Sequence, residues 1–277
     1  MANGILYVVA TPLGNLEDVT FKAIKVLKSA DAIACEDSRR TVKLLNRYEI
    51  KTPLITYQEH NKDAAGAKII TRLKRGERIA LVSDAGTPGI SDPGYNLVRD
   101  AIHAGISVEV VPGPSAIVSA VVLSGLPTDR FCFEGFIPPK RERRIKKFQS
   151  LADEERTIIL YESPHRIKES LDDMAGVLGA RRAALLREMT KINEEVLRGT
   201  VSELRDEIMG REKVYGEITL VIEGARHREA IRDNIEMLIE GEMQTFDGSP
   251  SELAKKLSQE TGISRKVIYA RILNMKK

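Results

Sequence analysis

Short β-branched and apolar runs alternate with amphipathic stretches through the first two-thirds of the chain. The runs predict five strands, at residues 5–10, 30–35, 54–57, 78–83 and 107–111. The stretches between them predict helices, at residues 20–28, 39–48, 64–75 and 95–104. Strands that alternate with helices are typical of an α/β layered fold. Because the runs LYVVA and IALVS are apolar throughout, we expect a predominantly parallel open sheet buried on both faces.

The same rhythm continues beyond Pro112 with a second set of predicted strands, at residues 131–136, 157–161, 183–187 and 217–222. From His227 onward the pattern is helical only, at residues 228–239 and 250–273. Within the latter, Ser249 or Ser251 can cap a first helix, Gly262 ends it and Ser264 can cap a second. We therefore predict three units: an N-terminal α/β domain of residues 1–115, a second α/β domain of residues 116–225 and a helical tail of residues 226–277.

Composition restricts the class of protein further. The formal net charge of +3 permits a nucleic-acid partner without arguing for one, and the 5% aromatic content without Trp disfavours a single-strand binding module. Cys35 and Cys132 have no metal-binding or disulfide-framework spacing, so we expect no metal site and a reducing, cytoplasmic setting. No apolar run approaches the ~18 residues of a membrane span, so we expect no membrane partner.

Three loops stand at the ends of predicted strands, where open α/β sheets bind their ligands. Residues 83–94, with the sequence SDAGTPGISDPG, hold several Gly and Pro that fix a backbone in shapes an ordinary connector does not need. Residues 10–18 and 111–116 form the other two loops. The signatures of dinucleotide-binding proteins, P-loop NTPases, zinc proteases and serine hydrolases are absent from the sequence. We expect the loops to line one cleft between the two α/β domains.

Longer motifs make the chain similar to a known family. These are VATPLGNLEDVT, CEDSRRT, SDAGTPGISDPG, VPGPSA, GFIP, YESPHR and LREMTKINEE, in this order. Together they resemble the tetrapyrrole-methylase-like superfamily of S-adenosylmethionine methyltransferases, over roughly residues 4 to 275. Within it, they resemble the branch that methylates the 2′-hydroxyl of a cytidine in 16S ribosomal RNA of the small ribosomal subunit. The resemblance implies two α/β domains with S-adenosylmethionine in the cleft between them, and a homodimer.

Matching positions carry the cofactor contacts of that family onto this chain. The resemblance implies that S-adenosylmethionine touches Leu13, Asp84, Thr87, Ser115, Ala116, Tyr161 and Gly216. The first loop departs from the family's more glycine-rich form at Thr11 and Pro12.

A ribose hydroxyl is a poor nucleophile while protonated, so a nearby carboxylate can assist the attack. Glu36 and Asp37 in CEDSRR, and Glu162 in YESPHR, are the candidates. Each of them can equally be an ion-pair partner of Arg39, Arg40 or Arg166, and both interpretations stay open from the sequence.

Two basic segments bear on RNA binding. The segment KRERRIKK provides Lys140, Arg141, Arg143, Arg144, Lys146 and Lys147 as candidates for phosphate contacts. A solvated helix face is the alternative for this segment. The second is the basic C-terminal segment of residues 265–277, an RNA-docking or structural appendage. A small-molecule methyltransferase is a weaker hypothesis, because a corrin or porphyrin substrate would need neither basic segment. A non-catalytic RNA-binding protein is the other alternative, but it would not need the loop at residues 83–94.

Overall fold

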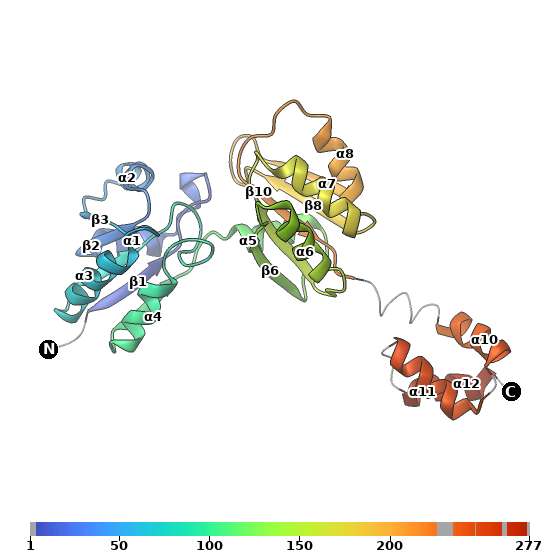
Figure 1. Cartoon of the computed structure of the whole chain (residues 1–277). Helices are drawn as coiled ribbons and strands as arrows, with labels where there is room; N and C mark the ends of the chain where they lie inside the picture. The colour runs from blue at the N-terminus through green and yellow to red at the C-terminus, as the bar shows by residue number, and fades with distance from the viewer. Residues whose placement is uncertain (1–3, 226–234, 247, 262–264, 276–277) are drawn as a thin grey trace.

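The computed structural model describes residues 4–225, 235–246, 248–261 and 265–275, which form two five-stranded sheets and a set of C-terminal helices (Figure 1). The first sheet is parallel throughout, with the strand order β3-β2-β4-β1-β5. Its strands are β1 (Ile5–Val9), β2 (Ala32–Cys35), β3 (Leu54–Thr56), β4 (Arg78–Leu81) and β5 (Ser107–Val111). The predicted parallel sheet is confirmed.

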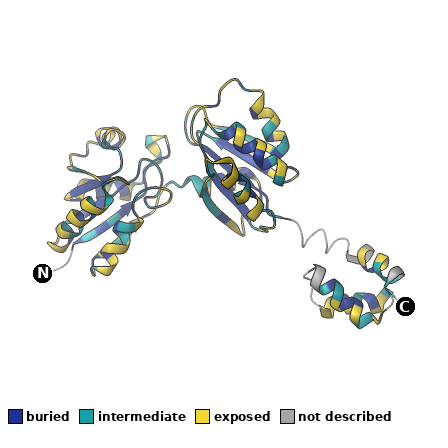
Figure 2. Ribbon diagram, in the orientation of Figure 1, coloured by how far each residue is buried: buried dark blue, intermediate teal, exposed yellow. Residues whose placement is uncertain are grey.

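Helices cover both faces of this sheet. Leu27 of α1 and Leu44 of α2 pack with Ile33 on one face, while Leu73 of α3 and Leu97 of α4 belong to the apolar cluster on the other. The burial colours of Figure 2 show the strands as a dark band between exposed helix surfaces. The helices are α1 (Phe21–Ser29), α2 (Ser38–Arg47), α3 (Lys62–Lys74) and α4 (Tyr95–His103), with the short 3-10 helix η1 (Leu16–Asp18) after β1.

The second sheet is mixed. Its order is β6-β7-β10-β8-β9; β6 and β7 are parallel, and the other neighbours are antiparallel. Its strands are β6 (Phe131–Phe136), β7 (Thr157–Glu162), β8 (Arg182–Arg187), β9 (Glu195–Thr200) and β10 (Ile218–Ile222). The sequence analysis did not find β9. The segment EVLRGT has a short apolar run because it forms an edge strand beside β8 alone.

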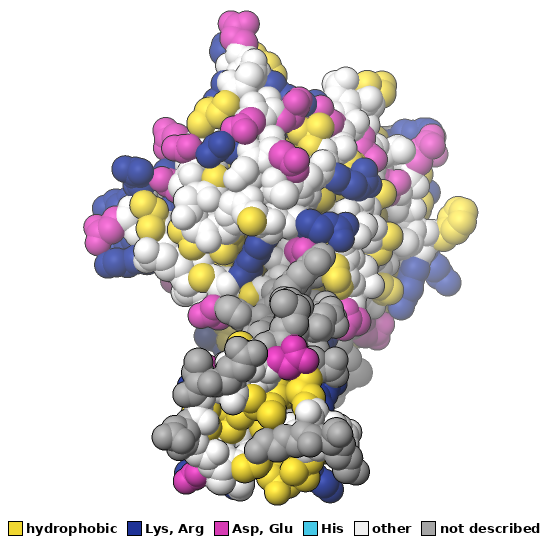
Figure 3. Space-filling view, turned by 90° about the vertical axis from the view of Figure 1, so that its right-hand side faces the viewer, with side chains coloured by type: hydrophobic (Ala, Val, Ile, Leu, Met, Phe, Trp, Pro, Cys, Tyr) yellow, Lys and Arg dark blue, Asp and Glu magenta, His cyan; other side chains and the backbone are white. Residues whose placement is uncertain are grey.

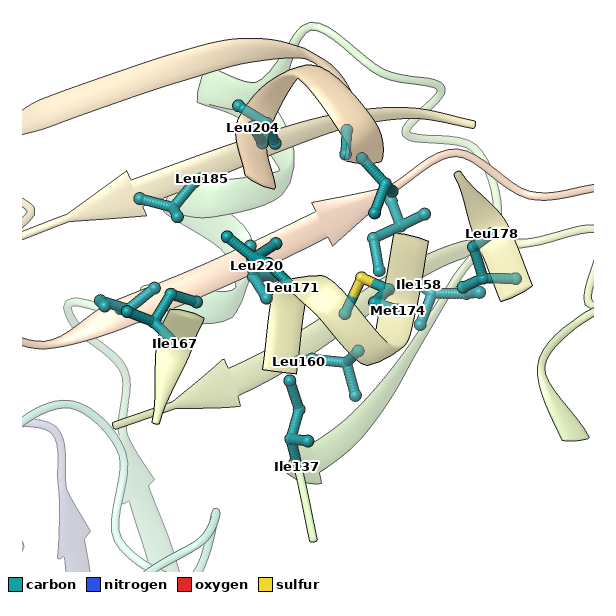
Figure 4. Close-up of a cluster of buried hydrophobic side chains, with 14 of the residues drawn as sticks. Ile137, Ile158, Leu160, Ile167, Leu171, Met174, Leu178, Leu185, Leu204 and Leu220 are labelled. Atoms are coloured by element: carbon teal, nitrogen blue, oxygen red, sulfur yellow. The ribbon is translucent and has the colours of Figure 1, made fainter. Parts of the chain in front are cut away.

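Alternate residues of the second sheet point to two cores. Ile158, Leu160, Leu185 and Leu220 face α6 (Arg141–Ser150), α7 (Ile167–Leu178) and α8 (Val201–Met209), as Figure 4 shows for part of this cluster. Ile159, Ala184 and Val221 face α5 (Ala116–Ser124) instead. The packing of α5 on the second sheet agrees with a domain boundary near residue 115. The exact boundaries of the domains stay predictions.

Side-chain caps explain where several helices begin. Thr20 accepts a hydrogen bond from the Ala23 N–H before α1, and Asp37 accepts one from the Arg39 N–H before α2. Thr200 and Glu203 form a reciprocal capping box at α8. These caps fix the first turn of each helix against the preceding strand or loop.

The C-terminal helices are α10 (Ile235–Thr245), α11 (Pro250–Thr261) and α12 (Arg265–Met275). Leu253 and Leu257 of α11 pack with Ile268 and Ile272 of α12 and with Ile239 of α10. The two helices predicted within residues 250–273 are confirmed, whereas residues 228–234 of the first predicted tail helix lie outside the described residues. Among the described helices, none combines the length and apolar character that a membrane crossing requires.

Candidate active site

A pocket of about 580 Å³ lies where the two α/β domains meet. The first domain contributes residues that follow β1, β2, β4 and β5, which are four neighbouring parallel strands, at their carboxyl ends. The second domain contributes the ends of β6 and β7 and the start of β10. The predicted cleft is therefore present, with apolar and acidic side chains on its walls.

Two of the loops are joined by their backbones. The Thr11 N–H donates to the Gly86 carbonyl at 2.8 Å, and the Gly86 N–H donates back to the Thr11 carbonyl at 3.0 Å. The Thr11 hydroxyl also donates to the Ser83 carbonyl at 3.1 Å. Thr11 thus fastens the first loop to the glycine and proline loop, and Pro12 lies in a smaller adjoining hollow rather than in the main pocket.

All seven cofactor-binding residues predicted from the resemblance line this one pocket, although they come from distant parts of the chain. They are Leu13, Asp84, Thr87, Ser115, Ala116, Tyr161 and Gly216. Their contacts with a methyl donor stay predictions, but their common location is what such a role requires.

Aromatic packing and a glycine shape the second-domain wall. The Tyr161 ring meets Phe133 and Phe136 edge to face, with ring centroids 4.8 and 5.4 Å apart. Burial, and then the nearby Asp92, raise the pKa of Tyr161 to about 12, so its hydroxyl stays protonated. Gly216 has φ +89°, and a Cβ there would lie 2.3 Å from Cγ of Glu188, which requires glycine at this point of the wall.

Asp84 joins the glycine and proline loop to the start of α2. Its Oδ1 accepts the Asp37 N–H at 3.0 Å, and its Oδ2 lies 3.5 Å from Nε of Arg40. The Asp84 carboxylate therefore has partners in the first domain as well as a face on the pocket.

Two of the three carboxylates predicted as proton acceptors are engaged elsewhere. The Glu162 side chain is buried; it accepts from Arg166 at 2.7 Å and also from Ser170. Asp37 does not line the pocket: it caps α2, and its hydrogen bonds with Arg39 lower its pKa to about 2. For both residues the geometry fits the ion-pair alternative, and a role as proton acceptor stays a prediction.

Glu36 and Asp92 also line the pocket, together with Asp84, Glu162 and Glu217. Burial, followed by the nearby Asp84, raises the pKa of Glu36. Burial, followed by the nearby Glu36, raises the pKa of Asp92 to about 7. The sequence places Asp92 in the glycine and proline loop but gives it no role, because its proximity to Glu36 depends on the tertiary fold.

The basic segment forms α6, and its six candidates differ in exposure. Arg144 is only 2% exposed and its guanidinium lies 2.6 Å from Asp173, so the prediction that it contacts phosphates is wrong. Arg141 is exposed but also binds Asp173 at 2.9 Å, and Lys147 pairs with Glu134. The exposed candidates are therefore Lys140, Arg141, Arg143 and Lys146. On the face shown in Figure 3, basic and acidic side chains are interspersed.

Among the described residues, no group of three or more His, Cys, Asp or Glu side chains is arranged to hold a metal ion. The pocket lining provides apolar side chains that can bind and orient an organic ligand, and carboxylates that are available for proton transfer.

Comparison with known proteins identifies the class: the chain belongs to the tetrapyrrole (corrin/porphyrin) methylases, whose family model matches residues 5–205. It is a methyltransferase of this class, and S-adenosylmethionine is its methyl donor.

Proteins named ribosomal RNA small subunit methyltransferase I are similar along most of the chain. The one from Bacillus subtilis is 49% identical over 82% of this chain and 77% of its own, and that from Xylella fastidiosa is 44% identical over 96% and 98%.

Solved structures share the fold. A uroporphyrin-III C-methyltransferase from Thermus thermophilus is 25% identical, with a TM-score of 0.56 over 79% of this chain and 94% of that one. A cobalt precorrin-4 methyltransferase is 18% identical, with a TM-score of 0.60 over 79% and 94%. The predicted two-domain fold of this family is confirmed.

Proposed function

We propose that this protein methylates the ribose 2′-oxygen of a cytidine in 16S ribosomal RNA, with S-adenosylmethionine as the donor. The observation that carries the proposal is the pocket between the two domains, which brings together all seven residues expected at the cofactor. The acceptor follows from the relatives named for small-subunit ribosomal RNA, at 42% to 52% identity.

The residues of the pocket fit the donor. Leu13, Ile117 and Met189 provide apolar surface suited to an adenine ring. Asp84 and Glu36 provide negative charge suited to a sulfonium and an ammonium group. The backbone at Gly216 is open to close approach because it carries no side chain. When bound, S-adenosylmethionine supplies an activated methyl group, and the protein's own contribution is to orient the acceptor hydroxyl and to receive its proton.

The exposed basic residues of α6 support an RNA acceptor. Phe136 lines the pocket at the end of β6, and Lys140 follows only four residues later, at the start of α6. Lys140, Arg141, Arg143 and Lys146 therefore lie on an element that leaves the pocket directly. Positive charge in this place suits the phosphates that flank a target nucleotide, and ribosomal RNA in the cytoplasm is the proposed partner.

The surface of α5 supports a homodimer. Its sequence AIVSAVVLS is apolar on all sides; Ala120 and Val121 are buried against the second sheet, while Val122 is 65% exposed. A helix that is apolar on every face is usually covered on every face. We propose that a second copy of the chain covers the exposed face of α5.

The test is methyl transfer from labelled S-adenosylmethionine to purified small subunits and to naked 16S RNA, followed by mapping of ribose methylation. The expected product carries one 2′-O-methylcytidine. A product methylated on a base, or methyl transfer to a porphyrin in place of RNA, would contradict the proposed acceptor.

A further inference from the structure

The loop that carries Asp92 has a tightly constrained backbone. Gly89 and Ser91 have φ of +86° and +62°. The backbone at Gly94 folds back onto that at Gly89, since a Cβ at Gly94 would lie 2.8 Å from the Gly89 nitrogen. Asp92 lies inside this closed turn and lines the pocket. A side chain on so constrained a loop is held in place, as a group that acts on a bound ligand must be.

The carboxylates of the pocket differ in their partners. Glu162 pairs with Arg166, Asp84 with Arg40 and Glu217 with Lys191. Neither Asp92 nor Glu36 forms an ion pair with any Lys or Arg in the described part of the chain. Glu36 lies near the positive charge of Arg40, whereas the charged groups that influence Asp92 are the acids Glu36, Asp84 and Glu217. Among the carboxylates that line the pocket, Asp92 therefore has the fewest stabilising interactions with positively charged groups.

We propose that Asp92 is the proton acceptor for the hydroxyl that is methylated, an inference that rests on the proposed function. Methyl transfer forms a bond between the ribose oxygen and the methyl carbon and breaks the bond between that carbon and sulfur, whose electron pair stays on sulfur. The O–H proton passes to a carboxylate oxygen of Asp92, and its electron pair stays on the ribose oxygen. The carboxylate and the sulfonium both become neutral, so the pocket gains no net charge during the step.

The surroundings of Asp92 adapt it to this role. Glu36 after β2, Asp84 after β4 and Glu217 before β10 are the acids that face it, and together with burial they make its ionised form costly. The nearby Ser83 hydroxyl partly offsets this cost, Tyr161 on β7 lies near Asp92, and Arg40 on α2 pairs with the neighbouring Asp84. Because its pKa is raised to about 7, Asp92 accepts a proton more readily than an ordinary aspartate does.

Asp92→Asn tests the proposal, because asparagine keeps the shape of the side chain but accepts no proton. We expect single-turnover methyl transfer to small subunits to fall by about 10²-fold or more, the usual contribution of a positioned base. We expect S-adenosylmethionine affinity, measured by calorimetry, to stay within about threefold. Asp92→Glu should restore part of the rate. Asp100→Asn, which changes an exposed carboxylate on α4, is the matched control and should leave both quantities unchanged.

A second readout does not depend on activity. The ¹³C shift of the Asp92 carboxyl, assigned by its loss in Asp92→Asn, should titrate near pH 7, and a midpoint near 4 would overturn the proposal. So would an Asp92→Asn rate within threefold of wild type, or a cofactor affinity that falls as much as the rate. Wild-type protein assayed in parallel separates the two hypotheses: no ribose methylation refutes the proposed function, whereas active wild type with an equally active variant refutes only the role of Asp92.

Discussion

The side chain of Lys191 crosses directly over Gly14, so that a Cβ at position 14 would lie 2.2 Å from the Lys191 Cγ. Beyond this crossing, Lys191 Nζ donates to Glu188 at 2.8 Å and to Glu217 at 3.0 Å. Close by, the Asn15 N–H donates to the Thr190 hydroxyl at 3.3 Å. A loop of the second domain is thereby fastened to the first loop of the first domain, beside a pocket that Glu217 lines.

Gly14→Ala should weaken this fastening. The new methyl group would displace the Lys191 side chain and break its bonds to Glu188 and Glu217, because the lysine is flexible and the backbone is not. We expect S-adenosylmethionine affinity to fall about fivefold, which corresponds to about 1 kcal/mol for a partly exposed ion-pair network. Calorimetry on Gly14→Ala, Lys191→Ala and the double variant checks the cause. Fully additive losses would show that the two residues act separately.

Asp92 should make the folded protein less stable as the pH rises, whereas an acid in a salt bridge makes it less stable as the pH falls. Its folded-state pKa of about 7 lies above the ordinary value of 3.8, so the folded state binds the proton more tightly than the unfolded state. The stability contributed by protonated Asp92 is present below pH 3.8 and is lost as the pH rises toward 7. At pH 8 Asp92→Asn should therefore be more stable than wild type, by a few degrees in melting temperature. This difference in melting temperature should vanish near pH 4. An equal difference at both pH values would contradict the raised pKa of Asp92.

Local sequence patterns were sufficient for most of the fold. The inner strands β1, β2 and β4 of the first sheet are largely apolar and buried, so they could be predicted from local sequence patterns alone. The edge strand β9 is covered on fewer sides and needs no such run. The antiparallel insertion of β10 between β7 and β8 is a matter of long-range pairing, which no local pattern specifies.

The candidate site was predictable only in part for the same reason. Glycine and proline spacing located the loop at residues 83–94, and the family resemblance gave the residues that line the pocket. The roles of single charged groups depend on partners far away in the chain. Arg144 binds Asp173, 29 residues away in the chain, and is therefore structural, whereas Asp92 and Glu36 come from distant segments and line the same pocket.

Arg144→Met should destabilise the protein strongly, because it leaves Asp173, 4% exposed, without its buried partner. Breaking a buried ion pair by removing one member typically costs about 3–5 kcal/mol. Urea unfolding measures the loss. Arg143→Met is the matched control, since Arg143 is the exposed neighbour on the same helix and its removal should change the free energy of unfolding by less than about 0.5 kcal/mol. Equal effects of the two variants would refute the structural role of Arg144.

Replacing Lys140, Arg143 and Lys146 together with alanine should weaken RNA binding without changing cofactor binding. Each phosphate contact that is lost should lower the slope of log affinity against log salt by about 0.7–0.9. If all three residues contact phosphates, we expect this slope to drop by about 2–2.7, as measured by filter binding of 16S RNA between low and physiological salt. An unchanged slope would mean that α6 presents only a solvated face.

Val122→Lys should separate the proposed homodimer into monomers. Val122 is 65% exposed on α5, so a lysine there is solvated in the monomer and need not disturb the fold. In a dimer that covers α5, the same charge would be buried without a partner, at a cost of several kcal/mol that the contact could not offset. Sedimentation velocity should show a dimer for wild type and a monomer for the variant. Ile102→Lys on α4, where the native side chain is 60% exposed, is the control and should remain dimeric. A wild type that itself sediments as a monomer would contradict the proposed dimer.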